Sequence, residues 1–186
     1  MTNVIDMGIR GALWDHMMPN LRGQTELCQQ LMTFTEIFDT SRDADFWIKL
    51  VVEEVTEFQE EFLLEGITPN LLKEFCDVLY VMQALLLLED YEGLVAFNTT
   101  AQEKLDAVLQ ECAAVADIAY GLWTTEQVLE GFRRVHDSNM SKLDNDGNVL
   151  RREDGKVLKG PNYEPPEMEG IFSCQTLLSA LTTRML

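Results

Sequence analysis

Apolar residues recur along much of this chain at intervals of three and four, the spacing that places side chains on one face of a helix. The stretch 43–64 carries the strongest such pattern, and residues 70–90 follow with a second apolar face. Three further stretches show the same spacing: 24–39, 101–120 and 126–137. The apolar stripe of the strongest stretch is formed by Trp47, Val51, Val55, Phe58 and Phe62.

Residues between the two strongest helices predict a tight turn. Gly66 suits a helix C-terminus, and Thr68-Pro69-Asn70 suits the turn and the cap of the next helix. Thr124 or Thr125 is expected to cap the last helix in the same way. The two strongest helices should therefore lie antiparallel and share their apolar faces.

Helical spacing stops after residue 137. Asp146-Gly147 and Asp154-Gly155 are turn signals, and residues 149–152 are expected to pair with 156–159 as a hairpin. An extended segment should follow at 160–166, and 171–186 suits a short amphipathic helix. The predicted fold class is all-α: a helical bundle with a small C-terminal β-hairpin or extended segment. Its parts are an N-terminal arm at 1–22, a helical domain at 23–137, and a C-terminal region at 138–186.

The composition of the chain limits the cellular environment and the kinds of binding partner that we expect. The chain has 186 residues, 46% of them hydrophobic, and a formal net charge of -18, which disfavours nucleic acid and anionic membrane as partners. Four scattered cysteines and two histidines make a zinc site or a disulfide framework improbable. The longest apolar run, 84–88, is too short to span a bilayer, so a cytoplasmic location is expected.

Basic residues gather in one segment. Seven of the 14 lysines and arginines lie between Arg133 and Lys159. In an acidic chain this favours an anion bound at one place, although exposed hairpins also carry such residues to remain soluble.

Two short pairs of acids carry the candidate chemistry. Glu54 and Glu57 are three residues apart, as are Glu74 and Asp77, so each pair projects from one helix face. Both pairs border apolar faces of consecutive helices, where unpaired carboxylates are costly to bury. Convergence of the four on Mg²⁺ would relieve that cost, whereas a solvated helix face is the alternative. Di-iron chemistry is disfavoured because no Glu-x-x-His pair occurs.

The paired acids resemble the motif of the all-α nucleotide pyrophosphohydrolases, the MazG and dimeric dUTPase-like superfamily. The motif reads Glu53-Glu54-Val-Thr-Glu57, a spacer, then Glu74-Phe-Cys-Asp77-Val-Leu-Tyr-Val. A second stretch, 135–142 with 152–166, resembles the C-terminal segment of phage and bacterial MazG-like proteins. The resemblance covers about residues 46–90 and 126–168 and marks 91–120 as a probable insertion.

The resemblance implies a Mg²⁺-dependent hydrolase, with Mn²⁺ as a possible substitute, that converts a (d)NTP to the (d)NMP and pyrophosphate. The implied metal ligands are Glu54, Glu57, Glu74 and Asp77, and Glu53 or Glu57 would orient or deprotonate the attacking water. If the chain is phage-encoded, it would work in the host cytoplasm. A homodimer or homotetramer is expected.

Contacts to the substrate are also implied by the resemblance. Asn139 and Lys142 would contact the nucleotide, and Lys156 and Lys159 the phosphates. Each has an ordinary structural alternative: Ser138 and Asn139 also suit a helix C-cap, and the two later lysines suit a charged hairpin edge. Trp47 and Phe34 can stack on a base, but their helical spacing also suits core packing.

The function itself has alternatives. A dUTPase-like or phosphoribosyl-ATP pyrophosphohydrolase activity fits the same acids. An acidic helical interaction protein without catalysis is the alternative from another class.

Overall fold

The computed structural model describes residues 25–38, 44–86, 99–153 and 155–171. The expected N-terminal arm, the expected end of the second strong helix at 87–90, residues 91–98 and nearly all of the expected tail helix lie outside these ranges. Each of the five stretches with helical spacing contains a helix, so the all-α class is confirmed. The helices are α2 (Thr25–Ile37), α3 (Ala44–Leu64), α4 (Pro69–Leu86), α6 (Thr99–Leu122) and α7 (Thr125–Met140).

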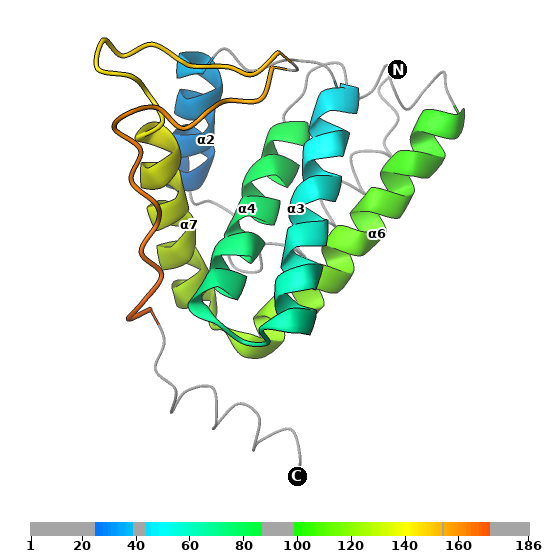
Figure 1. Ribbon diagram of the computed structural model, residues 1–186. Helices are drawn as coiled ribbons and strands as arrows, with labels where there is room; N and C mark the ends of the chain where they lie inside the picture. The colour runs from blue at the N-terminus through cyan, green and yellow to red at the C-terminus, as the bar shows by residue number, and fades with distance from the viewer. Residues whose placement is uncertain (1–24, 39–43, 87–98, 154, 172–186) are drawn as a thin grey trace.

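α3 and α4 form an antiparallel pair at the centre of the molecule (Figure 1). α6 packs beside α3, while α7 packs beside α4 and also contacts α2. The predicted antiparallel arrangement of the two strongest helices is therefore confirmed, and one face of the α3–α4 pair looks toward α2 and α7.

The turn between α3 and α4 follows from its residues. Gly66 has a φ of 78°, a left-handed conformation that glycine adopts without a Cβ clash, and its N–H donates to the Glu61 carbonyl. The Thr68 hydroxyl accepts from the backbone N–H of Leu71 at 3.0 Å, so Thr68 caps α4. Pro69 then occupies the first helical position, where no N–H is needed.

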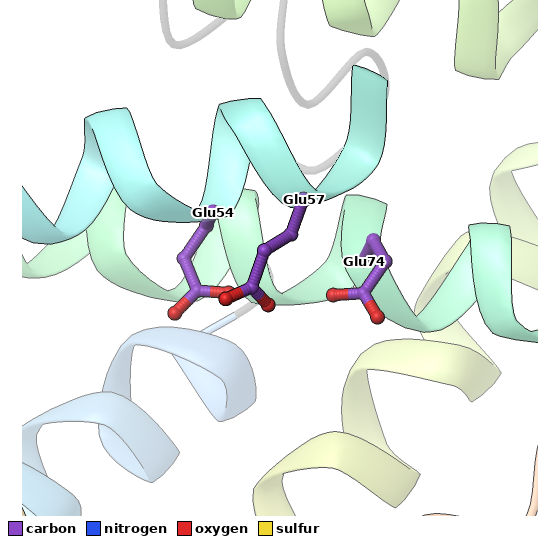
Figure 2. A group of neighbouring side chains, drawn as sticks. All are labelled: Glu54, Glu57 and Glu74. Atoms are coloured by element: carbon purple, nitrogen blue, oxygen red, sulfur yellow. The ribbon is translucent and has the colours of Figure 1, made fainter. Parts of the chain in front are cut away.

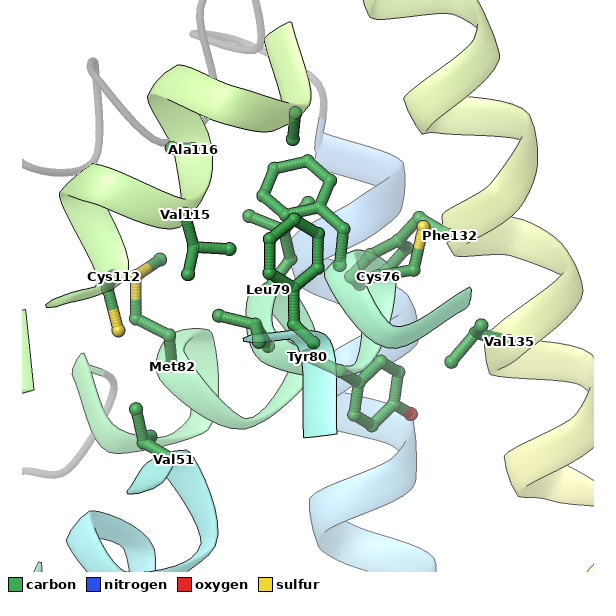
Figure 3. Packing of buried hydrophobic residues seen from close by; sticks show 14 of the residues in the cluster. Val51, Cys76, Leu79, Tyr80, Met82, Cys112, Val115, Ala116, Phe132 and Val135 are labelled. Atoms are coloured by element: carbon green, nitrogen blue, oxygen red, sulfur yellow. The ribbon is translucent and has the colours of Figure 1, made fainter. Parts of the chain in front are cut away.

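The core is built around α4, which has buried side chains on two sides. Cys112, Val115 and Ala116 of α6 pack on one side, while Phe132 and Val135 of α7 pack on the other (Figure 3). The predicted stripe of α3 is confirmed, since all of its members are buried except Phe62, which is partly buried. Burying each large apolar side chain stabilises the fold by about 1.5–3 kcal/mol.

α7 extends further than its sequence spacing indicates. Thr124 caps it as predicted, in a capping box with Gln127, but the helix continues to Met140 and ends at Ser141. The capping alternative for Ser138 and Asn139 is therefore wrong: both lie within the helix and are buried. No proline or glycine interrupts residues 138–140, so the helical hydrogen bonds continue through them.

The segment after α7 folds back over the helices. Within its described residues, 141–153 and 155–171, it has no regular strand, only an isolated antiparallel bridge between Arg151 and Val157. The turn of the expected hairpin includes Asp154, which lies outside the description, so the complete hairpin stays a prediction. The Gly160 N–H donates to the Lys142 carbonyl at 3.1 Å, where a Cβ would lie 2.5 Å from that oxygen. This close contact ties the segment to the end of α7.

None of the described helices has the length and apolar character needed to cross a membrane.

Candidate functional site

Three glutamates converge on one side of the α3–α4 pair. Glu54 and Glu57 extend from α3 and Glu74 extends from α4, with their carboxylates on the same side of the two helices (Figure 2). One oxygen from each lies within 4.8 Å of the others. Glu74 is buried, Glu54 is partly buried and Glu57 is exposed, so the group spans the boundary between core and solvent.

Asp77, the fourth expected ligand, lies beside this group and is held by Lys73. The Lys73 ammonium lies 2.8 Å from Asp77 Oδ2 and 2.9 Å from Glu74 Oε2. Burial alone would lower the pKa of Lys73, but the two carboxylates raise it overall, so Lys73 stays charged. Lys73 is therefore a cation already present in the acidic group.

The remaining acids repel one another. Burial, followed by the charges of Asp77 and Glu57, raises the pKa of Glu54 to about 8. Burial also raises the pKa of Glu74, although its hydrogen bond from Lys73 opposes the shift. Without a further cation, Glu54 is protonated in much of the population near neutral pH.

This donor set fits a divalent ion. It consists of carboxylate oxygens alone, which suit hard cations such as Mg²⁺ and Mn²⁺ rather than zinc or copper. A divalent ion would also offset the repulsion that raises the pKa of Glu54. The residues that would hold it are Glu54, Glu57 and Glu74, with Asp77 next to them.

A cavity of about 100 Å³ adjoins the acids. Glu54 and Asp77 form part of its wall, so the candidate metal group and the cavity are continuous. The apolar side of the cavity is lined by Phe34, Phe46, Trp47, Leu50, Tyr80, Val81 and Val157. The polar side adds Asn139, Lys142, Arg151 and Lys156, so the cavity joins an aromatic surface to cations and carboxylates.

Lys142 and Asn139 contribute to the cavity together. The Lys142 ammonium donates to Asn139 Oδ1 at 2.5 Å, and Asn139 is buried. Burial lowers the pKa of Lys142, with the charges of Asp77 and Glu54 acting against that shift. A partly buried cation in a cavity is suited to an anionic ligand.

The other expected substrate lysines have different positions. Lys156 lines the cavity and lies 2.8 Å from Glu53 Oε2, so it links the segment after α7 to α3. Lys159 instead lies over the Tyr163 ring, 4.5 Å from its centroid, and is exposed. Trp47 is compatible with both core packing and contact with a base, since it is 3% exposed in the core and also lines the cavity.

Two of the seven residues of the basic segment pair away from this site. Arg133 and Arg134 both pair with Glu130 on their own helix, at 2.8 and 2.9 Å. Arg134 also donates to the carbonyls of Glu167 and Glu169, which fixes the end of the described segment to α7.

Sequence reasoning did not identify several residues of the site. Lys73 precedes Glu74 directly, and a lysine among acids on one helix is a signal that was available. Phe46 and Arg151 come from two separate segments, and nothing in their spacing connects them, whereas Phe34 was expected, with Trp47, as a residue that can stack on a base. Tyr80 follows Asp77 by three residues on the same face of α4, so its place near the acids was also readable.

Comparison with known proteins finds no matching family model, no similar curated protein and no similar solved structure.

Proposed function

We propose that this protein is a divalent-metal-dependent nucleoside triphosphate pyrophosphohydrolase that releases the monophosphate and pyrophosphate. The observation that supports it best is the direct contact between the carboxylate group and an aromatic cavity that also presents lysines. A nucleotide has the complementary parts: a flat base, anionic phosphates, and oxygens that share a metal ion. The resemblance of the paired acids to the MazG-like motif supports the same reaction.

Each part of the site has a role in this proposal. The aromatic side of the cavity, including Trp47 and Phe46, packs against the base. Lys142 and Lys156 hold phosphate oxygens, each as a compact cation. Glu54, Glu57 and Glu74 hold Mg²⁺, with Asp77 beside them. When bound, the ion offsets charge on the pyrophosphate and promotes attack by water.

The attacking water needs a carboxylate to orient it. Glu57 belongs to the converging group and is exposed, whereas Glu53 is held in an ion pair with Lys156. We assign the role to Glu57, because its exposed carboxylate belongs to the group that would hold the ion. Glu53 would then act indirectly, by placing Lys156.

The proposal also includes the fold type and the oligomeric state: a pyrophosphohydrolase-like helical bundle that functions as a homo-oligomer. Leu63 and Leu64, at the end of α3, are 80% and 78% exposed, and Met32 and Val52 are also exposed. Such side chains suit contact with a second copy of the chain. Light scattering after gel filtration should give a dimer or tetramer mass, whereas a monomer mass would contradict this part.

The central test is a panel of ribo- and deoxynucleoside triphosphates with and without Mg²⁺, read by separate assays for pyrophosphate and orthophosphate. We expect pyrophosphate from at least one nucleotide, its loss in EDTA and its recovery with Mg²⁺ or Mn²⁺. Glu74→Gln should abolish it, whereas Glu60→Gln, at an exposed position of the same helix pair, should not. A protein that turns over no nucleotide with any divalent ion would support the non-catalytic alternative.

A further inference from the structure

A line of buried polar side chains leads from the cavity into the contact between α4 and α7. Lys142 Nζ contacts Asn139 Oδ1 and the Tyr80 hydroxyl lies 3.1 Å from His136 Nδ1, while the Asn139 side chain interacts with that hydroxyl between them. Asn139, Tyr80 and His136 are 7%, 4% and 8% exposed. Tyr80 lies within the hydrophobic core, with its hydroxyl toward the α7 side (Figure 3).

The donor and acceptor roles along this line are fixed from one end. A lysine ammonium can only donate, so Asn139 Oδ1 accepts and the Asn139 NH₂ group is directed at Tyr80. The hydroxyl oxygen of Tyr80 can then accept from Asn139, and its hydrogen can be donated to His136 Nδ1 when that nitrogen carries no proton. A neutral His136 with its proton on Nε2 provides the acceptor that completes the line.

The line has a physical task at the cavity. The Lys142 ammonium is attracted by Asp77 and Glu54, and its four-carbon side chain is flexible enough to turn toward them. Contact with those carboxylates would remove the ammonium from a bound phosphate. The hydrogen bond to the buried Asn139 opposes this movement, and Asn139 in turn interacts with the Tyr80 hydroxyl.

We propose that Tyr80 and His136 are positioning residues, which hold Asn139 and through it keep the Lys142 ammonium directed at the phosphates of the substrate. This inference rests on the proposed function, which gives Lys142 its phosphate contact. Neither Tyr80 nor His136 needs to touch the nucleotide phosphates for this role.

The first test is a double-mutant cycle in KM for the nucleotide that the wild-type protein hydrolyses best. Loss of one buried hydrogen bond, about 1 kcal/mol, should raise KM about fivefold in Tyr80→Phe, with kcat changed far less. In a Lys142→Met background, Tyr80→Phe should add almost nothing, because the side chain it positions is absent. Equal KM effects in both backgrounds would show that Tyr80 acts on the fold alone and would overturn the proposal.

Tyr120→Phe is the matched control. Its hydroxyl is also buried in the core and has no hydrogen-bond partner among the described residues. It should leave KM unchanged.

The second test needs no turnover, so it separates this inference from the proposed function. Nitrogen-15 NMR of the lysine ammonium groups, assigned with Lys142→Met, should show the Lys142 signal shifted in Tyr80→Phe and unchanged in Tyr120→Phe. His136→Asn, which can place an amide oxygen near the position of Nδ1, should keep that signal, whereas His136→Leu should shift it. An unshifted Lys142 signal in Tyr80→Phe would overturn the positioning role, whether or not the protein hydrolyses a nucleotide. If the expected shifts occur but no nucleotide is hydrolysed, only the proposed function is overturned.

Discussion

Glutamates occur in two contrasting settings in this molecule. On α7, the partly exposed Glu130 accepts hydrogen bonds from Arg134 and Arg133, which lower its pKa. Between α3 and α4, Glu54 is packed near Glu57 and Asp77, and burial followed by their charges raises its pKa to about 8. The surroundings thus favour the ionised form of Glu130 and disfavour the ionised form of Glu54.

The two settings differ in what the negative charge does for the stability of the folded protein. Glu130 has two cationic partners within its own helix, so its charge contributes a little to the folded state. In the group of Glu54, Glu57 and Glu74, Lys73 contacts Glu74 and is shared with Asp77. The charges of Lys73 and Lys156 only partly offset the repulsion at Glu54. A carboxylate group that costs stability in the absence of ligand is typical of a binding site.

The largest expected effect is on metal affinity. Glu57→Gln should weaken Mn²⁺ binding by about 100-fold or more, because loss of a ligand should cost at least as much as loss of an outer contact. Glu130→Gln removes the same charge elsewhere and should leave Mn²⁺ affinity within about twofold, since distant exposed charges are screened. Electron paramagnetic resonance of free Mn²⁺ measures both. Equal weakening by the two substitutions would show general charge attraction in place of a site.

The next effect is on stability in EDTA. The folded-state pKa of Glu54 is raised to about 8, above its unfolded-state pKa of about 4.5. Its contribution to stability is therefore complete below about pH 4.5 and is lost as the pH rises through about 8. Glu54→Gln keeps the shape without the charge. It should raise the free energy of unfolding at pH 8.5 by about 1–3 kcal/mol and change it little at pH 4.5.

Urea unfolding at the two pH values measures this difference. Mg²⁺ should stabilise the wild type at pH 8.5 and stabilise Glu54→Gln much less. A Glu54→Gln protein that is less stable than the wild type at pH 8.5 in EDTA would contradict the proposed repulsion.

The two settings also differ in how far the sequence predicts them. Apolar spacing fixes the faces of α3 and α4, and the interval of three residues fixes which acids share a face, so the convergence of Glu54, Glu57 and Glu74 was predictable. Asp77 shows the limit, because its geometry depends on the reach of Lys73 along the same helix. A flexible lysine can choose among several acids, and spacing does not say which.

Contacts between distant segments were less accessible. Tyr80 and His136 meet across the α4–α7 contact, 56 residues apart, and their pairing depends on how α7 docks. The burial of Asn139 depends on α7 continuing to Met140, whereas the sequence pattern weakens after 137. The aromatic side of the cavity combines α2, α3 and α4, so no single stretch of sequence contains it.

Lys156 extends the comparison to the basic residues. It lines the cavity and pairs with Glu53, whereas Arg133 pairs with Glu130 on the surface of α7. Lys156→Met should raise KM for a nucleotide about five- to tenfold, as expected for a partly exposed charged hydrogen bond to phosphate. Arg133→Met should leave KM unchanged. A KM effect of Lys156→Met no larger than that of Arg133→Met would contradict a phosphate contact by Lys156.

The smallest expected effect is on the ion pairs of Glu130 with Arg133 and Arg134 on α7. Glu130→Gln should lower the free energy of unfolding by less than about 1 kcal/mol at pH 7, because exposed ion pairs are solvated and flexible. The folded-state pKa of Glu130 is lowered, so its ion pairs stabilise the protein above about pH 4.5, and this stabilisation is lost as the pH falls through the folded-state pKa. The pH dependence is opposite to that of Glu54. Added salt should erase it through screening, while leaving most of the Glu54→Gln effect, which arises first from burial. Unfolding of both variants at low and high salt therefore separates the two settings, and equal salt sensitivity would show that the Glu54 group is only another solvated charge cluster.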